Sequence, residues 1–111
     1  MEIHLHDAPE GATVLELEGR LDRFSAPSLR ARVRDLLATG TSQLVIDLNE
    51  VDFLDSSGLG AMLSARKLTT EAGGGLRIAR PNSELQLMLE MTALSRLLHP
   101  FPTLADALAD L

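Results

Sequence analysis

The pattern of apolar and polar positions divides the first half of the chain into a hairpin, a helix and a buried strand. Residues 3–6 alternate apolar with polar, residues 14–18 alternate again, and a turn with Pro and Gly lies between them, which predicts a hairpin. Apolar side chains then recur at helical spacing from Leu29 to Leu37, after a start with Ser, Ala and Pro, which predicts an amphipathic helix. Residues 44–48 are almost wholly apolar, as is typical of a central strand buried on both faces.

The second half of the chain continues this alternation of helices and strands. The sequence predicts a helix over 59–72, a strand over 76–79, a third helix starting at 81–84 and a last helix over 104–111. Because strands and helices alternate after the hairpin, the connections favour a mixed or mostly parallel sheet with helices packed against it. We therefore predict an α/β fold in a single domain of residues 1–111, with four to five strands and about four helices.

Composition and charge exclude several classes of function. The chain has 111 residues and no cysteine, so it has no disulfide framework, no thiolate zinc site and no cysteine nucleophile. Its net charge of −6 and its lack of Trp and Tyr argue against direct nucleic-acid binding, which favours basic surfaces and stacking aromatic side chains. Because no apolar run could span a bilayer and the N-terminus does not look like a signal peptide, we expect a cytoplasmic protein without membrane contact.

The clearest functional signal lies in residues 52–60. This segment follows the buried strand and precedes a helix, and functional groups in α/β sheets gather at such junctions. Ser56 and Ser57 suit the first turn of the helix, where a hydroxyl can accept hydrogen bonds from free backbone N–H groups. Gly58 and Gly60 lack a Cβ atom, so another backbone or a bulky group can come close. The spacing alone is equally compatible with two ordinary capping serines.

The chain resembles the STAS domain family, which is named for sulfate transporters and anti-sigma-factor antagonists. The most specific resemblance is at residues 51–60, with the sequence VDFLDSSGLG. Residues 19–22 (GRLD) and 25–26 resemble a second family motif, a loop followed by a helix. Residues 44–48 and 101–107 resemble the central strand and the closing helix of the family. The resemblance therefore extends over essentially the whole chain.

This resemblance implies a protein-binding switch and not an enzyme. In antagonists of the family, the second serine of Asp-Ser-Ser-Gly is phosphorylated by a partner anti-sigma factor, a serine kinase of the histidine-kinase-like ATPase type. That serine is Ser57 in this sequence. The unphosphorylated antagonist binds the anti-sigma factor and so releases the sigma factor, and a serine phosphatase of the PP2C type removes the phosphate.

The resemblance also implies a partner-binding surface around Ser57. Asp22 matches an acidic residue in the family's loop, and Asp55 matches the acidic residue just before the two serines. We expect the surface to contain Asp22, Arg23, Ser25, Asp55, Ser56, Gly58, Leu59 and Gly60. We expect no cofactor, no metal and no catalytic residue, and a monomer or weak dimer.

Other sites fit the sequence less well. A serine hydrolase needs a base for Ser57, but the histidines lie in no recognisable motif and the serines are not in a Gly-x-Ser-x-Gly sequence. His4 and His6 would face the same side of a strand and could bind a metal, but no third ligand is apparent, which favours an ordinary histidine pair. The aspartates within 47–55 could suggest a magnesium site, but their spacing along a strand and loop favours roles as helix caps or solvated surface groups.

An alternative function lies within the same family. Some STAS proteins resemble non-switching adaptor subunits, for instance of lipid-transport ATPase complexes, and others are components of stress-sensing assemblies. An adaptor would bind its partner constitutively and would need no phosphorylatable hydroxyl. The presence of Ser57 followed by Gly58 therefore favours the switch.

Overall fold

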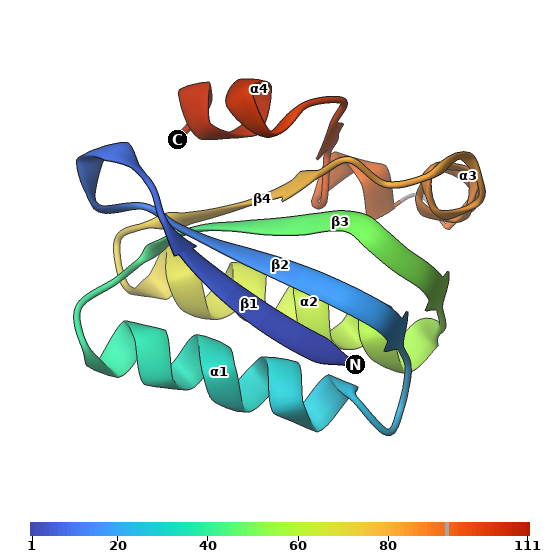
Figure 1. The fold of residues 1–111 in the computed structure, drawn as a ribbon, viewed down its shortest axis with the longest axis horizontal. Helices are drawn as coiled ribbons and strands as arrows, with labels where there is room; N and C mark the ends of the chain where they lie inside the picture. The colour runs from blue at the N-terminus through green and yellow to red at the C-terminus, as the bar shows by residue number, and fades with distance from the viewer. Residues whose placement is uncertain (93) are drawn as a thin grey trace.

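A computed structural model of the chain describes residues 1–92 and 94–111, which form one mixed sheet flanked by helices (Figure 1). The five strands lie in the order β1-β2-β3-β4-β5; the first pair is antiparallel and the other pairs are parallel. The predicted fold class is thereby confirmed. Within the described residues, no helix is both long enough and apolar enough to cross a membrane. The elements are β1 (Glu2–Asp7), η1 (Pro9–Gly11), β2 (Thr13–Leu21), α1 (Ala26–Ala38), β3 (Gln43–Leu54), α2 (Ser56–Glu71), β4 (Gly75–Ala79), α3 (Ser83–Met91), η2 (Leu94–Arg96), β5 (Pro100–Phe101) and α4 (Leu104–Ala109).

In β1 the apolar and polar side chains lie on opposite faces of the sheet, whereas β2 also buries an apolar residue, Val14, on the face of the polar ones. Ile3 lies opposite Leu17, and Leu5 lies opposite Leu15, so alternate residues of β1 and β2 share one side of the sheet. Ile3, Leu15 and Leu17 belong to the main core, which also contains residues of α1 and α2. The polar residues of β1 therefore lie on the other face, where they remain exposed.

The central strand β3 is longer than the sequence predicts. Residues 44–48 form its first half and all are buried, which confirms the prediction of a strand covered on both faces. The strand then continues to Leu54 through a stretch predicted to be a connection. Its register with β2 shifts twice here, so the apolar alternation breaks down, and Asn49 and Glu50 are exposed. Because only Asp55 separates β3 from α2, the strand leads directly into the helix.

Two apolar clusters lie on the two faces of the sheet. In Figure 1, α1 and α2 cover one face, and α4 lies over the other. The larger cluster joins β2 and β3 to α1, α2 and α3, and the smaller joins β2, β3 and β4 to α4. Neighbouring residues of β3 therefore enter different clusters, which explains why its first half is apolar on both sides. Members of the larger cluster include Leu15, Leu44, Ile46, Leu29, Met62 and Leu89, and those of the smaller are Val14, Val45, Ala79 and Ala107.

An ion pair between a buried carboxylate and a partly exposed arginine joins β3 to the end of β4, since the Arg80 side chain is 37% exposed. Asp47 is only 1% exposed, and its two carboxylate oxygens accept hydrogen bonds from Arg80 at 3.1 and 2.5 Å. Asp47 also accepts from the backbone N–H of Asn49 at 3.1 Å. The hydrogen bond to Asp47 raises the pKa of Arg80, against the opposing effect of burial. This arginine supplies the positive charge that Asp47 needs, so a magnesium ion is not required to explain the buried carboxylate.

Replacing Arg80 with alanine should destabilise the fold strongly. The variant Arg80→Ala leaves the carboxylate of Asp47 buried without its cation, and we expect a loss of about 3 kcal/mol in the free energy of unfolding. The matched control is Arg77→Ala, because Arg77 pairs with Asp110, whose side chain is 51% exposed, and such pairs contribute under about 1 kcal/mol. Urea unfolding of both variants measures the difference. Equal losses would show that burial of the Asp47 pair has no energetic consequence.

Candidate functional site

The two motif segments meet at one end of the sheet. The parallel strands β2 and β3 end side by side, with Leu21 directly opposite Leu54. The loop that follows β2 and the first turn of α2 therefore lie next to each other (Figure 1). The backbone N–H of Asp55 donates to the carbonyl oxygen of Leu21 at 3.3 Å and closes the junction. This is the edge of a parallel sheet at which α/β proteins usually place functional groups.

Asp55 caps α2 and also holds the neighbouring loop. One of its carboxylate oxygens accepts from the backbone N–H of Gly58 at 3.0 Å, and the other accepts from the backbone N–H of Arg23 at 3.3 Å. The alternative in which Ser56 and Ser57 are ordinary capping serines does not hold, because the cap is the residue before them. Ser56 is exposed and Ser57 is half-buried in the first turn of α2. Neither hydroxyl is needed for capping.

The loop of residues 22–25 is organised by Asp22 and Ser25. A carboxylate oxygen of Asp22 accepts from the backbone N–H groups of Phe24 at 2.9 Å and Ser25 at 3.1 Å. The hydroxyl of Ser25 accepts from the N–H of Asp22 at 2.9 Å and donates to the carbonyl oxygen of Arg20 at 2.7 Å. Ser25 occupies the N-cap position of α1, but its side chain makes no capping hydrogen bond to that helix. Its hydroxyl closes the loop instead.

The hydrogen bonds to Asp22 favour its ionised form. Burial raises the pKa of Asp22, but hydrogen bonds from Ser25, Phe24 and Arg20 together lower it, and the net pKa is below the ordinary value. The carboxylate lies at the edge of the site with 15% of its side chain exposed. Asp22 therefore adds a fixed carboxylate beside the start of α2, paired on one side with the guanidinium of Arg20 at 3.5 Å.

Two exposed aromatic rings lie in this region, each in contact with an arginine. The guanidinium of Arg20 lies 3.8 Å from the centre of the Phe53 ring, and that of Arg23 lies 4.7 Å from the Phe24 ring. Phe24 is 77% exposed and Phe53 is 36% exposed. The sequence already draws attention to Phe24, because it is an aromatic residue in a polar loop next to Asp22, whereas Phe53 lies within β3 and was given no role. The surface thus offers apolar as well as charged groups to a partner.

Two residues predicted to bind a partner lie in the interior. A Cβ atom on Gly58 would come within 2.3 Å of the carbonyl oxygen of Leu21 and 2.7 Å of the Leu54 side chain. Leu59 is 6% exposed and belongs to the main core. Gly58 and Leu59 therefore support the surface from beneath, because α2 must pack closely on the ends of β2 and β3. Gly60 is half-buried, and a Cβ there would meet only the tip of Arg30, at 3.5 Å.

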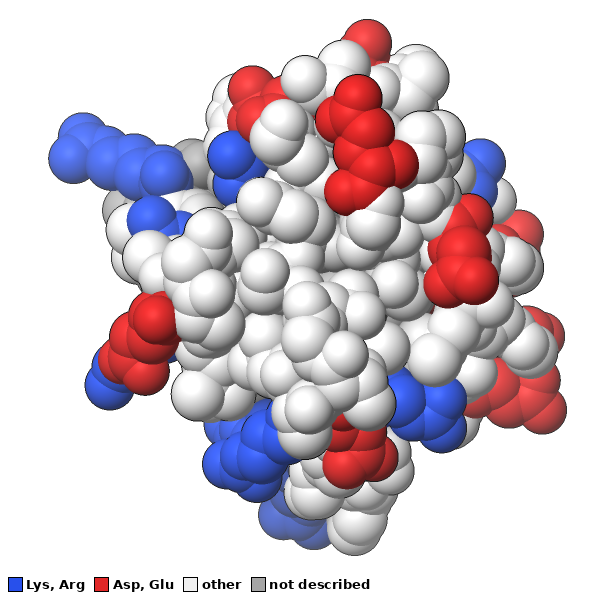
Figure 2. Space-filling model, turned by 90° about the vertical axis from the view of Figure 1, so that its left-hand side faces the viewer, with Lys and Arg blue, Asp and Glu red and all other residues white. Residues whose placement is uncertain are grey.

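The remaining predicted residues are brought together at this end of the molecule. The opposite end, on the left of Figure 1, shows acidic and basic side chains spread around an uncharged centre (Figure 2). The net charge of −6 is thus not gathered into one acidic patch on that face. The surface around Ser57 is made of the residues Asp22, Arg23, Ser25, Asp55 and Ser56, together with Arg20, Phe24 and Phe53.

Comparison with known proteins gives consistent matches across the chain. The family model of the STAS domain matches residues 6–107. The chain is 26% identical to an anti-sigma F factor antagonist of Paenibacillus polymyxa over 102 residues, which cover 91% of this chain and 87% of that protein. It is 31% identical to an anti-sigma-B factor antagonist of Bacillus subtilis over 80 residues, which cover 72% of each protein.

A solved structure has the same architecture. The crystal structure of an anti-sigma factor antagonist from Mycobacterium paratuberculosis superimposes with a TM-score of 0.86 and 27% sequence identity. The superposition covers 98% of this chain and 92% of that one. The matched region includes both motif segments described above.

The contact between Gly58 and Leu21 makes a testable prediction. The variant Gly58→Ala should lose about 2 kcal/mol or more of stability, because the added methyl group meets a backbone carbonyl that cannot move away easily. Gly60→Ala is the control in the same helix, and it should be neutral or slightly stabilising because alanine favours helix interiors. Urea unfolding measures both. A Gly58→Ala protein as stable as Gly60→Ala would mean that the junction is looser than described.

Proposed function

Since the chain belongs to the STAS domain family, we propose that it is an anti-sigma-factor antagonist whose binding state is set by phosphorylation of Ser57. The observation that carries the proposal is the position of Ser57 in the first turn of α2. Asp55 takes over capping of this helix and ties it to the loop of residues 22–25. A hydroxyl that is not used for capping thus lies within a firmly held surface.

The proposed partner is an anti-sigma factor that is also a serine kinase of the histidine-kinase-like ATPase type. With Ser57 unphosphorylated, the surface binds this partner, and the sigma factor is released. A serine phosphatase of the PP2C type returns the phosphorylated chain to its binding state. The names of the relatives support this role, because they are antagonists of anti-sigma F and anti-sigma-B factors. The cycle takes place in the cytoplasm, and ATP and magnesium are bound by the kinase, so the chain itself needs no catalytic activity.

The local backbone favours phosphorylation without unfolding. A helix N-terminus carries a partial positive charge and free N–H groups, and it tolerates an anion. Ser57 occupies this position in α2. The side chains that fix the junction, Asp55 and Gly58, are separate from the hydroxyl that would be modified. A phosphate can therefore be added while the fold is retained.

The phosphate would act on the partner through charge and bulk. It adds about −1.5 to −2 charges at neutral pH. Asp55 is the residue that caps the same helix turn, and Asp22 lies in the adjoining loop, so the new charge joins two existing carboxylates. Both carboxylates are held by backbone N–H groups and so cannot easily turn away. A loss of about 3–4 kcal/mol of interface energy would weaken binding by two to three powers of ten.

A constitutive adaptor remains the alternative function within the family. Such a protein would use the same exposed groups, including Phe24 and Phe53, but would not need a free hydroxyl in the first turn of α2. A Ser57 hydroxyl that is not needed to cap α2 therefore supports the switch over the adaptor. Phosphorylation separates the two functions directly.

A kinase assay with site variants tests the proposal. The purified protein is incubated with ATP, magnesium and each histidine-kinase-like anti-sigma factor of its own genome, and intact masses are measured. We expect one added phosphate on the wild type and on the control Ser56→Ala, and none on Ser57→Ala. Tight binding to another partner with no phosphate from any candidate kinase would support the adaptor instead.

Charge at position 57 should control affinity for the anti-sigma factor. We expect Ser57→Ala to bind permanently even with ATP present, and Ser57→Glu to fold normally but to bind about 100-fold to 1,000-fold more weakly. Calorimetric titration gives the affinities, and circular dichroism checks the fold. Wild-type affinity in Ser57→Glu would exclude electrostatic repulsion as the cause of release.

A further inference from the structure

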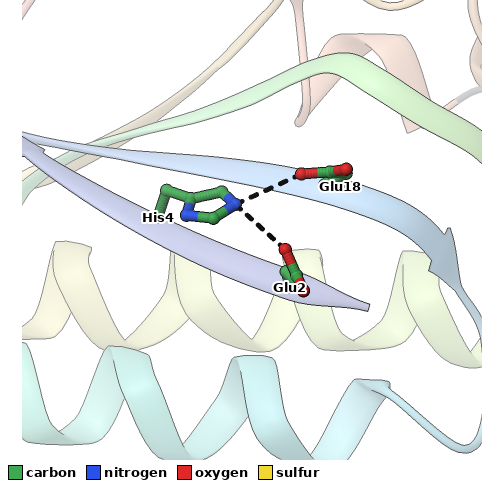
Figure 3. Close-up of side chains that lie close together, drawn as sticks. All are labelled: Glu2, His4 and Glu18. Atoms are coloured by element: carbon green, nitrogen blue, oxygen red, sulfur yellow. Dashed lines mark hydrogen bonds and ion pairs between the residues drawn. The ribbon is translucent and has the colours of Figure 1, made fainter.

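The opening hairpin brings two carboxylates against one imidazole on its exposed face (Figure 3). Glu2 of β1 lies directly opposite Glu18 of β2, and His4 is two residues along from Glu2 on the same side of the strand. The Nε2 atom of His4 lies 3.4 Å from Oε2 of Glu2 and 3.2 Å from Oε2 of Glu18. All three side chains are exposed, so the group is open to solvent.

This arrangement calls for a positive charge between the carboxylates. Like charges directly opposite each other on antiparallel strands destabilise the pair. A neutral imidazole carries one N–H, so Nε2 can donate to only one carboxylate at a time. Glu2 and Glu18 are therefore incompletely compensated by His4 alone, and a cation bound to both would remove their repulsion.

The geometry points to a surface site for a divalent transition-metal cation of the Zn²⁺ class, held by Glu2, His4 and Glu18. One ligand atom from each residue lies within 4.8 Å of the other two. Zn²⁺ binds such ligands at about 2.1 Å in a tetrahedron, which separates neighbouring ligand atoms by about 3.4 Å. The distances from Nε2 of His4 to the carboxylate oxygens of Glu2 and Glu18 are close to this value. Water would complete the coordination.

The type of ligand selects among metals. Imidazole together with carboxylates suits zinc and its neighbours, whereas calcium and magnesium prefer oxygen ligands alone. The sequence predicts no metal site because no third ligand is apparent beside His4 and His6. The hairpin supplies it, since the register places Glu18 opposite Glu2, and the Glu18 side chain reaches diagonally to His4, whose directly facing residue is Glu16.

His6 provides a natural internal comparison. It lies on the same face of β1, but its Nε2 atom pairs with a single carboxylate, Oε2 of Glu16 at 3.4 Å, whereas His4 contacts two. The residue directly opposite His6 is Val14, which offers no ligand atom. The proposed site is therefore centred on His4, and it is independent of the proposed function of Ser57.

Titration of the whole chain with Zn²⁺ in a calorimeter at about pH 7 tests the site. We expect one Zn²⁺ per chain in the wild type, binding at least ten times weaker in both His4→Ala and Glu18→Gln, and an affinity within about twofold of wild type in His6→Ala. Lowering the pH should weaken binding, because protons compete with the metal for the imidazole. The substituted positions are exposed, and circular dichroism of each variant checks that the fold is retained.

Three results would overturn the proposal. The first is no binding by the wild type at about millimolar Zn²⁺. The second is an equal loss in His6→Ala and His4→Ala, which would indicate a simple histidine pair. The third is unchanged affinity in Glu18→Gln, which would show that β2 contributes no ligand to the metal.

Discussion

The close packing of α2 on the end of β2 is the constraint on which the site depends. The first turn of the helix comes so near to the carbonyl oxygen of Leu21 that position 58 has no room for a Cβ atom. The N–H of Asp55 bonds to that same carbonyl, and the carboxylate of Asp55 then reaches both the helix and the neighbouring loop. Two segments more than thirty residues apart in the chain thus become one rigid surface.

Because of this close packing, different residues of the motif 51–60 have different structural roles. Val51, Leu54 and Leu59 are buried and anchor the segment in the core. Asp55 and Gly58 form the junction. Those roles leave the serine hydroxyls uncommitted, so chemistry at this position need not disturb the packing beneath it. A surface of this kind suits a switch in which charge changes and the fold does not.

How completely the negative charge of an acidic residue in the sheet is compensated depends on how deeply that residue is buried. Asp47 is enclosed and receives an arginine with two hydrogen bonds, because an uncompensated buried carboxylate is very costly. Glu2 and Glu18 face solvent, where repulsion is weaker and an incomplete partner such as His4 is tolerated. The first arrangement stabilises the fold, and the second leaves an open set of ligand atoms on the surface.

The sequence by itself determined the elements whose signals are local. The helical spacing in α1, the apolar first half of β3 and the alternation in the hairpin follow from which residues must face a core, and all three were predicted. The motif of residues 51–60, and Ser57 as its candidate modified residue, were likewise visible in the sequence because the motif consists of consecutive residues.

Only the tertiary structure decided the features that depend on pairing between distant residues. These include the extension of β3 to Leu54, the two-residue strand β5 and the interior position of Gly58. The exposed ring of Phe53 and the approach of Glu18 to His4 belong to the same group. For the extension of β3, strand β5, the interior position of Gly58 and the approach of Glu18 to His4, the physical reason is that contacts between separate strands and helices set them, and the separation of these residues along the chain carries no periodic signal.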